Sequence, residues 1–478
     1  LTMAYRRADA ANRPAQPRVR VSGGLLDAFD AQLPFRLTRG QTEVSSAILD
    51  DLARPRPMQR LLQGEVGSGK TVVALRAMLA VVDAGGQAAL LAPTEVLAAQ
   101  HYQTIRTLLG DLGGGRMLGT PDVATDVVLL SGSLPAAAKK SALLRAASGE
   151  AGIVVGTHAL LADRVQFADL GLIVVDEQHR FGVEQRAVLA DKAAGRPHVL
   201  VLTATPIPRS VAMTIFGDLD VSTLTELPAG RAHVSTVVVD ASSRPQWVER
   251  AWERVAEEVA AGRQVFVVVP RIASSAEGTG VVELADQLRS GPLAGLRVGV
   301  LHGQLPGDVK DEVMGAFAGG QLDVLVATTV IEVGVDVPNA SMMVVWDADR
   351  FGISQLHQLR GRIGRGSHPG VCLLVTRAPA GEAARVRLDA VAATRDGFEL
   401  AELDLEQRRE GDVLGAAQAG GRSSLRLLRV LEHAGLIARA RELATECVAR
   451  DPDLTTPGFA DAIRATELLA SPDWLERN

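Results

Sequence analysis

MQRLLQGEVGSGKTVVALRAML, residues 58–79, joins a short apolar run to a helical pattern through a glycine-rich loop. The loop, GEVGSGKT at residues 64–71, fits the phosphate-loop pattern G-x-x-x-x-G-K-[ST]. A strand is expected at 58–62 and a helix from near Thr71, so the loop has the flanking elements that this pattern requires. Glycines in such a loop let backbone N–H groups converge on a phosphate at a helix N-terminus. The stretch therefore predicts a nucleotide-binding α/β unit.

The loop is expected to bind ATP together with Mg²⁺. Lys70 would reach the β- and γ-phosphate oxygens, and the hydroxyl of Thr71 would be a ligand of Mg²⁺. Both residues are thus candidates for catalysis or metal binding as well as for nucleotide binding. The residues of the loop expected to bind the nucleotide are Gly64, Gly67, Ser68, Gly69, Lys70 and Thr71.

The second half of a nucleotide site is expected at the end of a later apolar strand, and LIVVDEQH at residues 172–179 provides it. Asp176 is expected to hold Mg²⁺. Glu177 is the candidate to orient or deprotonate the attacking water, because it lies beside the metal ligand; the alternative is a solvated acid. His179 either links the nucleotide site to a DNA-facing surface or packs as a structural histidine.

Length and composition restrict the class of protein. A chain of 478 residues is long for one hydrophobic core and predicts two or three domains. Its two cysteines, Cys372 and Cys447, lie far apart and predict neither a disulfide framework nor a metal cluster. No segment approaches the ~18 consecutive apolar residues of a membrane span. A formal net charge of -6 argues against a strongly basic surface, so any DNA contact is expected to be local.

Short apolar runs alternate with longer helical patterns from about residue 33, which is typical of a parallel sheet built from βαβ units. A less sheet-like passage at 224–232 separates two such blocks, and only helical patterns follow after about residue 380. Strands are expected in the first block at 58–62, 88–92, 127–130, 153–155, 172–175 and 199–202, and in the second block at 265–269, 297–301, 324–326, 343–346 and 371–375.

We therefore predict an α/β protein with two lobes that face each other across a ligand cleft, followed by a helical appendage. Because the chain starts at Leu1, without a secretory signal pattern, we expect it to be part of a longer protein. The predicted domains are the remnant of an N-terminal linker at 1–32, a first lobe at 33–232, a second lobe at 233–380 and a C-terminal helical region at 381–478.

The second block carries QLHQLRGRIGRG at residues 355–366, which places arginines three residues apart. On a helix or tight turn Arg362 and Arg365 would point the same way. Two arginines that face the cleft would stabilise the charge that develops on a transferred phosphate. Hydrolysis would then depend on closure of the two lobes.

The ordered set of motifs in residues 35–366 resembles the superfamily 2 helicases, which implies two tandem RecA-like lobes of the P-loop NTPase type. LTRGQ at 37–41 resembles the motif that recognises adenine, and its amide residue is Gln41. GVD at 334–336 belongs to a string that resembles motif V, in which Asp336 would take the ribose hydroxyls. The resemblance assigns DNA binding, or its coupling to the nucleotide, to Pro93, Thr94, Thr157, His158, His179, Thr203, Thr205 and Thr328.

Four longer strings resemble the RecG family and its relative Mfd. They are DEQHRFGV at 176–183, TTVIEVGVDVPNA at 328–340, TRDGFELAELDLE at 394–406 and GDVLGAAQ at 411–418. The last two resemble the translocation motif that both families share, in which Arg408 and Gln418 would couple lobe closure to DNA movement. For Arg408 the alternative is a solvated charge on a run of charged residues. The chain departs from that motif at Arg409 and Glu410, which stand where a turn-forming Gly-Pro pair is usual.

The resemblance implies an ATP-dependent DNA helicase, or double-stranded-DNA translocase, that remodels stalled forks and Holliday junctions in recombination and repair. It also implies a bacterial cytoplasmic protein associated with the nucleoid and not with a membrane, acting as a monomer on branched and double-stranded DNA, with single-strand-binding protein as a partner. An N-terminal wedge domain is expected outside residues 1–32. The alternatives are an Mfd-like transcription-repair translocase, and an ATP-switched DNA-binding module without motor activity. Aromatic residues make up 3% of the chain, which disfavours a stacking platform for single-stranded bases.

Overall fold

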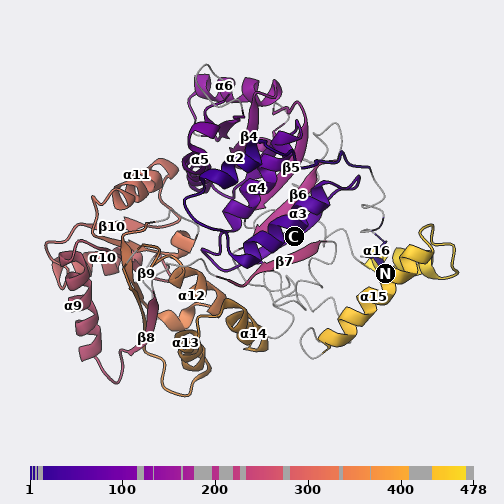
Figure 1. The fold of residues 1–478 in the computed structure, drawn as a ribbon. Helices are drawn as coiled ribbons and strands as arrows, with labels where there is room; N and C mark the ends of the chain where they lie inside the picture. Colours follow the sequence, from indigo (N-terminus) through magenta and orange to yellow (C-terminus); the bar gives the residue numbers. More distant parts are fainter. Residues whose placement is uncertain are drawn as a thin grey trace. The chain divides into compact units, whose positions relative to one another are not determined.

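The protein is described from a computed structural model, drawn as a ribbon in Figure 1. The chain forms two compact units: Leu1–Gly64, Ser68–Glu226 and Leu405–Asn478 make up the first, and Glu65–Gly67 and Leu227–Asp404 make up the second. The residues that the structure describes are 1–2, 4–5, 8, 14–115, 123–132, 134–162, 165–176, 196–203, 219–226, 233–272, 280–332, 337–366, 368–407 and 433–469.

The first unit is built on a parallel sheet of seven strands in the order β3-β4-β2-β5-β6-β1-β7. Its strands are β1 (Gln59–Gly64), β2 (Gln87–Leu91), β3 (Asp126–Leu130), β4 (Ala151–Gly156), β5 (Leu170–Asp176), β6 (His198–Thr203) and β7 (Asp220–Leu224). Its helices are α2 (Leu25–Gln32), α3 (Arg39–Leu52), α4 (Lys70–Asp83), α5 (Glu95–Leu109), α6 (Ala136–Ala147), α15 (Ala434–Arg450) and α16 (Phe459–Leu469), with short 3₁₀ turns η1 (Gly110–Gly113) and η2 (His158–Leu161).

The second unit has a parallel sheet of six strands in the order β10-β11-β9-β12-β13-β8. Its strands are β8 (Val234–Asp240), β9 (Gln264–Val268), β10 (Val298–Leu301), β11 (Val324–Ala327), β12 (Ala340–Val345) and β13 (Gly370–Thr376). Its helices are α9 (Gln246–Ala260), α10 (Val281–Ser290), α11 (Gly307–Ala318), α12 (Ile353–Arg360), α13 (Ala383–Ala393) and α14 (Gly397–Gln407), with 3₁₀ turns η4 (Thr329–Glu332) and η5 (Ala348–Arg350).

The second sheet has a hydrophobic core on each face, which explains why its inner strands read as continuous apolar runs. Phe266 and Val268 of β9 belong to one core, whereas Val265 and Val267 of the same strand belong to the other. A parallel sheet that is covered on both faces leaves few strand positions for polar residues. Alternate residues of the inner strands therefore point into different cores, and most of them are apolar, with the buried Gln264 and Ser341 as exceptions.

All eleven predicted strands are present, with ends that differ by a few residues, and the predicted α/β fold is confirmed. Two further strands, β7 and β8, were not predicted. Both lie at an edge of their sheet and are only partly buried, so polar residues interrupt the apolar ones. Only helices follow β13 among the described residues, as predicted. In the part of the chain that is described, no helix combines the length and apolarity needed to cross a membrane.

Helix α2 packs on α4, the helix that follows the phosphate-binding loop. The Asp83 carboxylate in the last turn of α4 accepts hydrogen bonds from the backbone N–H groups of Leu25 and Leu26 at 2.7 and 2.9 Å. Arg76 of α4 forms an ion pair of 2.7 Å with Asp30 of α2. The apolar face of α2 is fully buried through Leu25, Leu26 and Phe29. The chain before residue 33 thus contributes to the core of the first unit.

Candidate functional site

The candidate nucleotide-binding residues of the first unit follow strands that are neighbours in the sheet. The phosphate-binding loop follows β1, Thr203 ends β6 and Asp176 ends β5, and these strands lie side by side in the order β5-β6-β1. Gln63 of β1 is in register with Thr203, and Leu202 of β6 is in register with Asp176. Because the carboxyl ends of parallel strands share one edge, the fold brings these residues to the same edge of the sheet.

The phosphate-binding loop has the backbone conformation that its glycines predict. Gly67 and Gly69 have φ angles of 83°, which favour glycine, and α4 begins at Lys70 without a side-chain cap. A side chain on Gly64 would place its Cβ 2.7 Å from the Ser68 hydroxyl. The Lys70 ammonium donates to the Gly64 carbonyl at 2.7 Å. A loop of small residues with a lysine and an uncapped helix N-terminus fits a phosphate group.

Gln41 connects the start of α3 to this loop. Its Oε1 accepts from the N–H of Thr38 at 2.9 Å, and the Thr38 hydroxyl accepts from the Gln41 N–H at 3.2 Å, which forms a capping box. Its Nε2 donates to the Ser68 carbonyl at 2.8 Å. The backbone of the same helix end is also held by Glu226, which accepts from the Gly40 N–H at 3.1 Å. Gln41 is therefore bonded to the loop itself, and its contact with adenine stays a prediction.

Asp176 and Thr71 offer the oxygen ligands that Mg²⁺ prefers. Thr71 lies in the first turn of α4, and Asp176 lies at the end of β5 with its side chain 15% exposed. One carboxylate oxygen of Asp176, Oδ2, lies 2.7 Å from Nε2 of His101 on α5. The donor set fits a magnesium ion bound together with a nucleotide. Glu177 and His179 lie outside the described residues.

The candidate DNA-facing loops of the first unit follow β2 and β4, which are also neighbours. Thr94, directly after Pro93, caps α5 by accepting from the Leu97 N–H at 3.3 Å. Thr157 is buried and accepts from the Ala159 N–H at 3.4 Å in the η2 turn. Each hydroxyl keeps its own hydrogen for a further acceptor. His158 is the first residue of η2, but its side chain is not described. Thr205 lies outside the described residues.

In the second unit, the candidate arginines follow α12 in a tight turn. The helix ends at Arg360, the N–H of Arg362 donates to the Leu359 carbonyl at 2.9 Å, and the Nε of Arg365 donates to the Gly361 carbonyl at 3.0 Å. Thr328 follows β11, and its N–H donates to the Leu301 carbonyl at 3.1 Å. The described residues do not include Asp336, Arg408 or Gln418, nor the departure at Arg409 and Glu410.

Arg360 is a structural residue that the sequence analysis did not single out. It is 5% exposed and donates to the carbonyls of Val391 and Thr394 at 2.7 and 2.8 Å, at the end of α13. Burial lowers the pKa of its guanidinium. The sequence holds a signal for this role, because Arg360 follows Leu356 by four residues and so lies on the buried face of α12.

His101 is the second residue that sequence reasoning missed. It stands seven residues after Thr94, about two helical turns, so both residues lie on a similar face of α5. That spacing gives no hint of its partner, because Asp176 lies 75 residues further along the chain. The contact arises because β2, which leads into α5, pairs with β5, which ends at Asp176.

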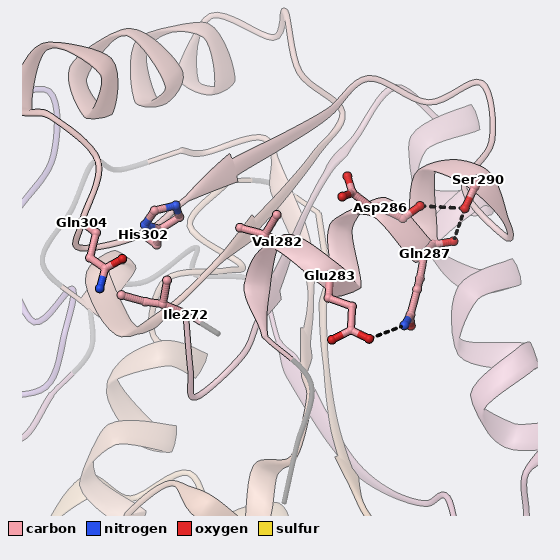
Figure 2. A pocket seen from close by; sticks show the side chains of 8 residues that line it. All are labelled: Ile272, Val282, Glu283, Asp286, Gln287, Ser290, His302 and Gln304. Carbon is pink, nitrogen blue, oxygen red and sulfur yellow. Dashed lines mark hydrogen bonds between the residues drawn. The ribbon is translucent and has the colours of Figure 1, made fainter. Parts of the chain in front are cut away.

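A pocket of about 690 Å³ lies in the second unit between α10 and the segment after β10. Figure 2 shows Glu283 and Asp286 on α10, with His302 and Gln304 across from them. Gln287 donates to Glu283 at 3.3 Å, as the dashed line in Figure 2 marks. Two carboxylates in the wall disfavour a phosphate here. The other residues that line the pocket are Ile272, Val282 and Ser290.

Three families match successive parts of this chain. Residues 38–214 match the DEAD/DEAH box helicases, and residues 249–367 match the helicase conserved C-terminal domain. Residues 394–468 match the C-terminal part of domain 3 of the ATP-dependent DNA helicase RecG. The first match contains the phosphate-binding loop, and the second contains the arginine turn.

Curated relatives named ATP-dependent DNA helicase RecG match nearly the whole chain. The protein of Mycobacterium tuberculosis is 56% identical over 448 residues, which cover 90% of this chain and 60% of that protein. The Synechocystis protein is 46% identical over 90% of this chain and 50% of its own length, and the Bacillus subtilis protein is 42% identical over 95% and 64%. The chain thus spans about 60% of the length of its mycobacterial relatives.

Solved structures are also similar to this chain. A structure of RecG bound to a three-way DNA junction is 37% identical, with a TM-score of 0.72 over 91% of this chain and 55% of that chain. Mss116p bound to single-stranded RNA and AMP-PNP is 15% identical with a TM-score of 0.58, covering 92% of this chain and 97% of that chain, and shares the fold alone.

Proposed function

The chain belongs to the RecG family of ATP-dependent DNA helicases, and on that premise we propose that it is an ATP-driven motor that moves along double-stranded DNA and remodels branched DNA. The activity, substrates and partners of the whole protein are inferred from relatives of which the chain spans about 60%. Stalled forks and four-way junctions would be its substrates, in recombination and repair, in the bacterial cytoplasm.

The observation that carries the proposal is the arrangement of the phosphate-binding loop and Asp176 at the ends of strands in one parallel sheet. An isolated loop of this sequence is compatible with many nucleotide-binding proteins. A carboxylate on a nearby strand end adds the metal ligand that nucleotide hydrolysis requires. The arginine turn of the second unit adds a group suited to phosphoryl transfer.

In the proposed reaction, this chain's residues bind, orient and neutralise the triphosphate. Backbone N–H groups of the loop and Lys70 would hold the phosphates, and Thr71 and Asp176 would hold Mg²⁺. When bound there, Mg²⁺ would offset the negative charge of the phosphates. Glu177 would orient or deprotonate the water. When a nucleotide binds, the Lys70 ammonium would give up its hydrogen bond to the Gly64 carbonyl and bond to phosphate oxygens instead.

Arg362 and Arg365 would supply positive charge to the transferred phosphoryl group. A guanidinium donates along two edges, which matches the oxygens of a phosphate better than a single ammonium does. Such an arginine is worth about 10³–10⁵ in kcat in well-studied nucleotide hydrolases. Their removal would therefore slow turnover far more than it weakens nucleotide binding.

The loops after β2 and β4 would hold the phosphate backbone of DNA. The hydroxyls of Thr94 and Thr157 accept hydrogen bonds from backbone N–H groups. The Thr94 hydroxyl keeps a hydrogen that it can donate to a phosphate oxygen, whereas the buried Thr157 would hold the shape of its loop. Contacts to phosphate fix the position of a protein on DNA without reading its sequence. A motor that steps along any duplex needs contacts of this kind.

The test is steady-state ATP hydrolysis with no DNA, with blunt duplex and with forked DNA. The intact chain is compared with Lys70→Ala and Arg365→Ala, and Arg377→Ala serves as an exposed arginine control in the second unit. We expect DNA to stimulate hydrolysis by the intact chain and by the control. Both site variants should lose at least about 100-fold in kcat.

Two other outcomes would change the assignment. Tight ATP binding with negligible turnover that DNA does not stimulate would favour a nucleotide-dependent DNA-binding switch. Stimulation by DNA that Arg365→Ala leaves intact would remove the arginine turn from the mechanism. An Mfd-like role is not favoured, because the family match after residue 394 is to RecG.

A further inference from the structure

His101 and Asp176 form a contact that none of the expected roles explains. Nε2 of His101 lies 2.7 Å from Oδ2 of Asp176, and the two side chains are 13% and 15% exposed. An ionised carboxylate only accepts hydrogen bonds, so Nε2 carries the hydrogen and donates it. The contact is a charge-assisted hydrogen bond in a largely buried place, which is stronger than an ordinary surface contact.

The helix that carries His101 is fixed at several points. The Thr94 hydroxyl caps its N-terminus, and the adjacent Glu95 accepts from the N–H of Gly132 in the loop after β3 at 2.7 Å. Ile105 and Leu109 on the same helix are fully buried. A donor on a packed helix holds its partner in a narrower range of positions than a donor on a loop does.

The geometry bears on the role of Asp176 as a metal ligand. An aspartate carboxylate rotates about two side-chain bonds, and a bond to Oδ2 restricts both rotations. With Oδ2 taken by His101, the orientation of Oδ1 is also fixed, since the two oxygens belong to one planar group. Hydrogen-bonded partners of metal-binding carboxylates commonly set ligand orientation, and their loss costs about 10–100-fold in metal affinity or activity.

We propose that His101 is a positioning residue that orients the Asp176 carboxylate for Mg²⁺ bound with the nucleotide. The proposal rests on the proposed function, in which Asp176 holds Mg²⁺. It makes α5 a single rigid part that carries both a candidate DNA-binding loop, at its N-terminus, and the support of the metal ligand, two turns later. The group responsible for this role is the N–H donor at Nε2 of His101.

Three variants separate positioning from packing. His101→Leu removes the donor and keeps an apolar side chain. His101→Gln keeps an N–H donor on a side chain of similar length, so it should restore the function. Gln103→Leu is the matched control, because Gln103 lies on the exposed face of the same helix.

The measurement is the affinity of the whole chain for fluorescent mant-ADP, without metal and across a Mg²⁺ titration. We expect His101→Leu to raise the Mg²⁺ concentration needed for half-maximal tight binding by about tenfold or more. Its metal-free affinity should equal that of the unmodified chain. His101→Gln should return most of the loss, and Gln103→Leu should match the unmodified chain. Combining His101→Leu with Asp176→Asn should add little to Asp176→Asn alone, because both act on one ligand.

The outcomes distinguish this proposal from the function on which it rests. If Mg²⁺ strengthens mant-ADP binding, Asp176→Asn removes that effect and His101→Leu does not alter it, the positioning role is wrong. The same follows if His101→Leu lowers the melting temperature and metal-free affinity together and His101→Gln rescues neither. If Asp176→Asn itself leaves the Mg²⁺ dependence unchanged, the proposed metal ligand is wrong, whatever His101 does.

Discussion

In the first unit the candidate ligand-binding residues are bonded directly to other parts of the chain, whereas in the second unit the helix before the candidate arginines is anchored by its own side chains. Gln41 binds the Ser68 carbonyl and His101 binds Asp176. In the second unit, Arg360 holds α12 to the end of α13, and Ser354 donates to the buried Asp404 at 2.9 Å. Substitutions in the first unit should therefore change ligand affinity, and those of Ser354 and Arg360, near the two ends of α12, should change stability.

The largest effect should come from Arg360→Met. This change removes a buried guanidinium and leaves the carbonyls of Val391 and Thr394 without its hydrogen bonds. We expect the free energy of unfolding of the second unit to fall by about 3 kcal/mol, because buried polar groups without partners are costly. Urea denaturation monitors the loss, and mant-ADP affinity in the native baseline should stay unchanged.

Ser354→Ala is the matched control for Arg360→Met. It removes one hydrogen bond, so its cost should be about 1 kcal/mol. The contrast between the units would fail if Arg360→Met weakened nucleotide binding as strongly as a change in the phosphate-binding loop does. Equal losses of stability in the two variants would show that Arg360 stabilises the second unit no more than a single hydrogen bond does.

A smaller effect is expected from Gly69→Ala, compared with Gly85→Ala. The two glycines have φ angles of 83° and 81°, so alanine is strained by about 1–2 kcal/mol at both. A Cβ on Gly69 would also run into the Gln41 amide, whereas one on Gly85 meets nothing within 4 Å. Only Gly69→Ala should weaken mant-ADP binding, by about tenfold or about 1.4 kcal/mol.

Thermal melting and fluorescence titration of both glycine variants test this pair. Similar losses of stability with different nucleotide affinities would confirm that the Gln41 contact shapes the loop. If both variants bound mant-ADP equally well, the bond between Gln41 and Ser68 would have no influence on the nucleotide site.

The smallest effect concerns His198 at the start of β6. Its Nδ1 accepts from the Met58 N–H at 3.0 Å, and Nε2 lies 3.2 Å from the Gln16 carbonyl. Burial lowers the pKa of this imidazole below its ordinary 6.5. Below pH 6.5 the unfolded chain takes up a proton that the folded chain resists, so stability is lost as pH falls and is constant above about pH 7.

The free energy of unfolding of the first unit should therefore decrease between pH 7 and pH 5 because of this residue. His198→Gln offers an amide that can accept and donate but does not titrate. Denaturation curves at a series of pH values should show a shallower decrease for the variant. An identical slope would remove His198 from the acid response.

The sequence predicts the fold best where burial is complete. The central strands of the second sheet read as largely apolar runs because cores cover both of their faces. β7 and β8 escaped prediction because each is an edge strand with one side partly exposed, so polar residues alternate with apolar ones. How deeply a strand is buried depends on whether it lies at the edge of the sheet, and the local sequence does not encode the order of the strands.

The same limit applies to the candidate site. Glycines, a lysine and a strand-end aspartate have local signatures, so the phosphate-binding loop and Asp176 could be proposed from the sequence alone. His101 was not, because its partner depends on the pairing of β2 with β5. Gln41 was assigned to adenine by resemblance, and its bond to Ser68 became visible only when α3 was placed beside the loop. Contacts between distant segments are what the sequence lacks.

The strand order of the first sheet also has a consequence for synthesis on the ribosome. β1 leads into the phosphate-binding loop and is made first among the seven strands, but both of its neighbours, β6 and β7, are made last. The Met58 N–H and the His198 ring, which meet beside β1, are 140 residues apart in the chain. β1 cannot form its strand pairs until β6 and β7 have been synthesised, and pairing between segments so far apart in sequence is slow. The nascent chain therefore carries its phosphate-binding loop for most of the synthesis of this sheet before the sheet can close around it.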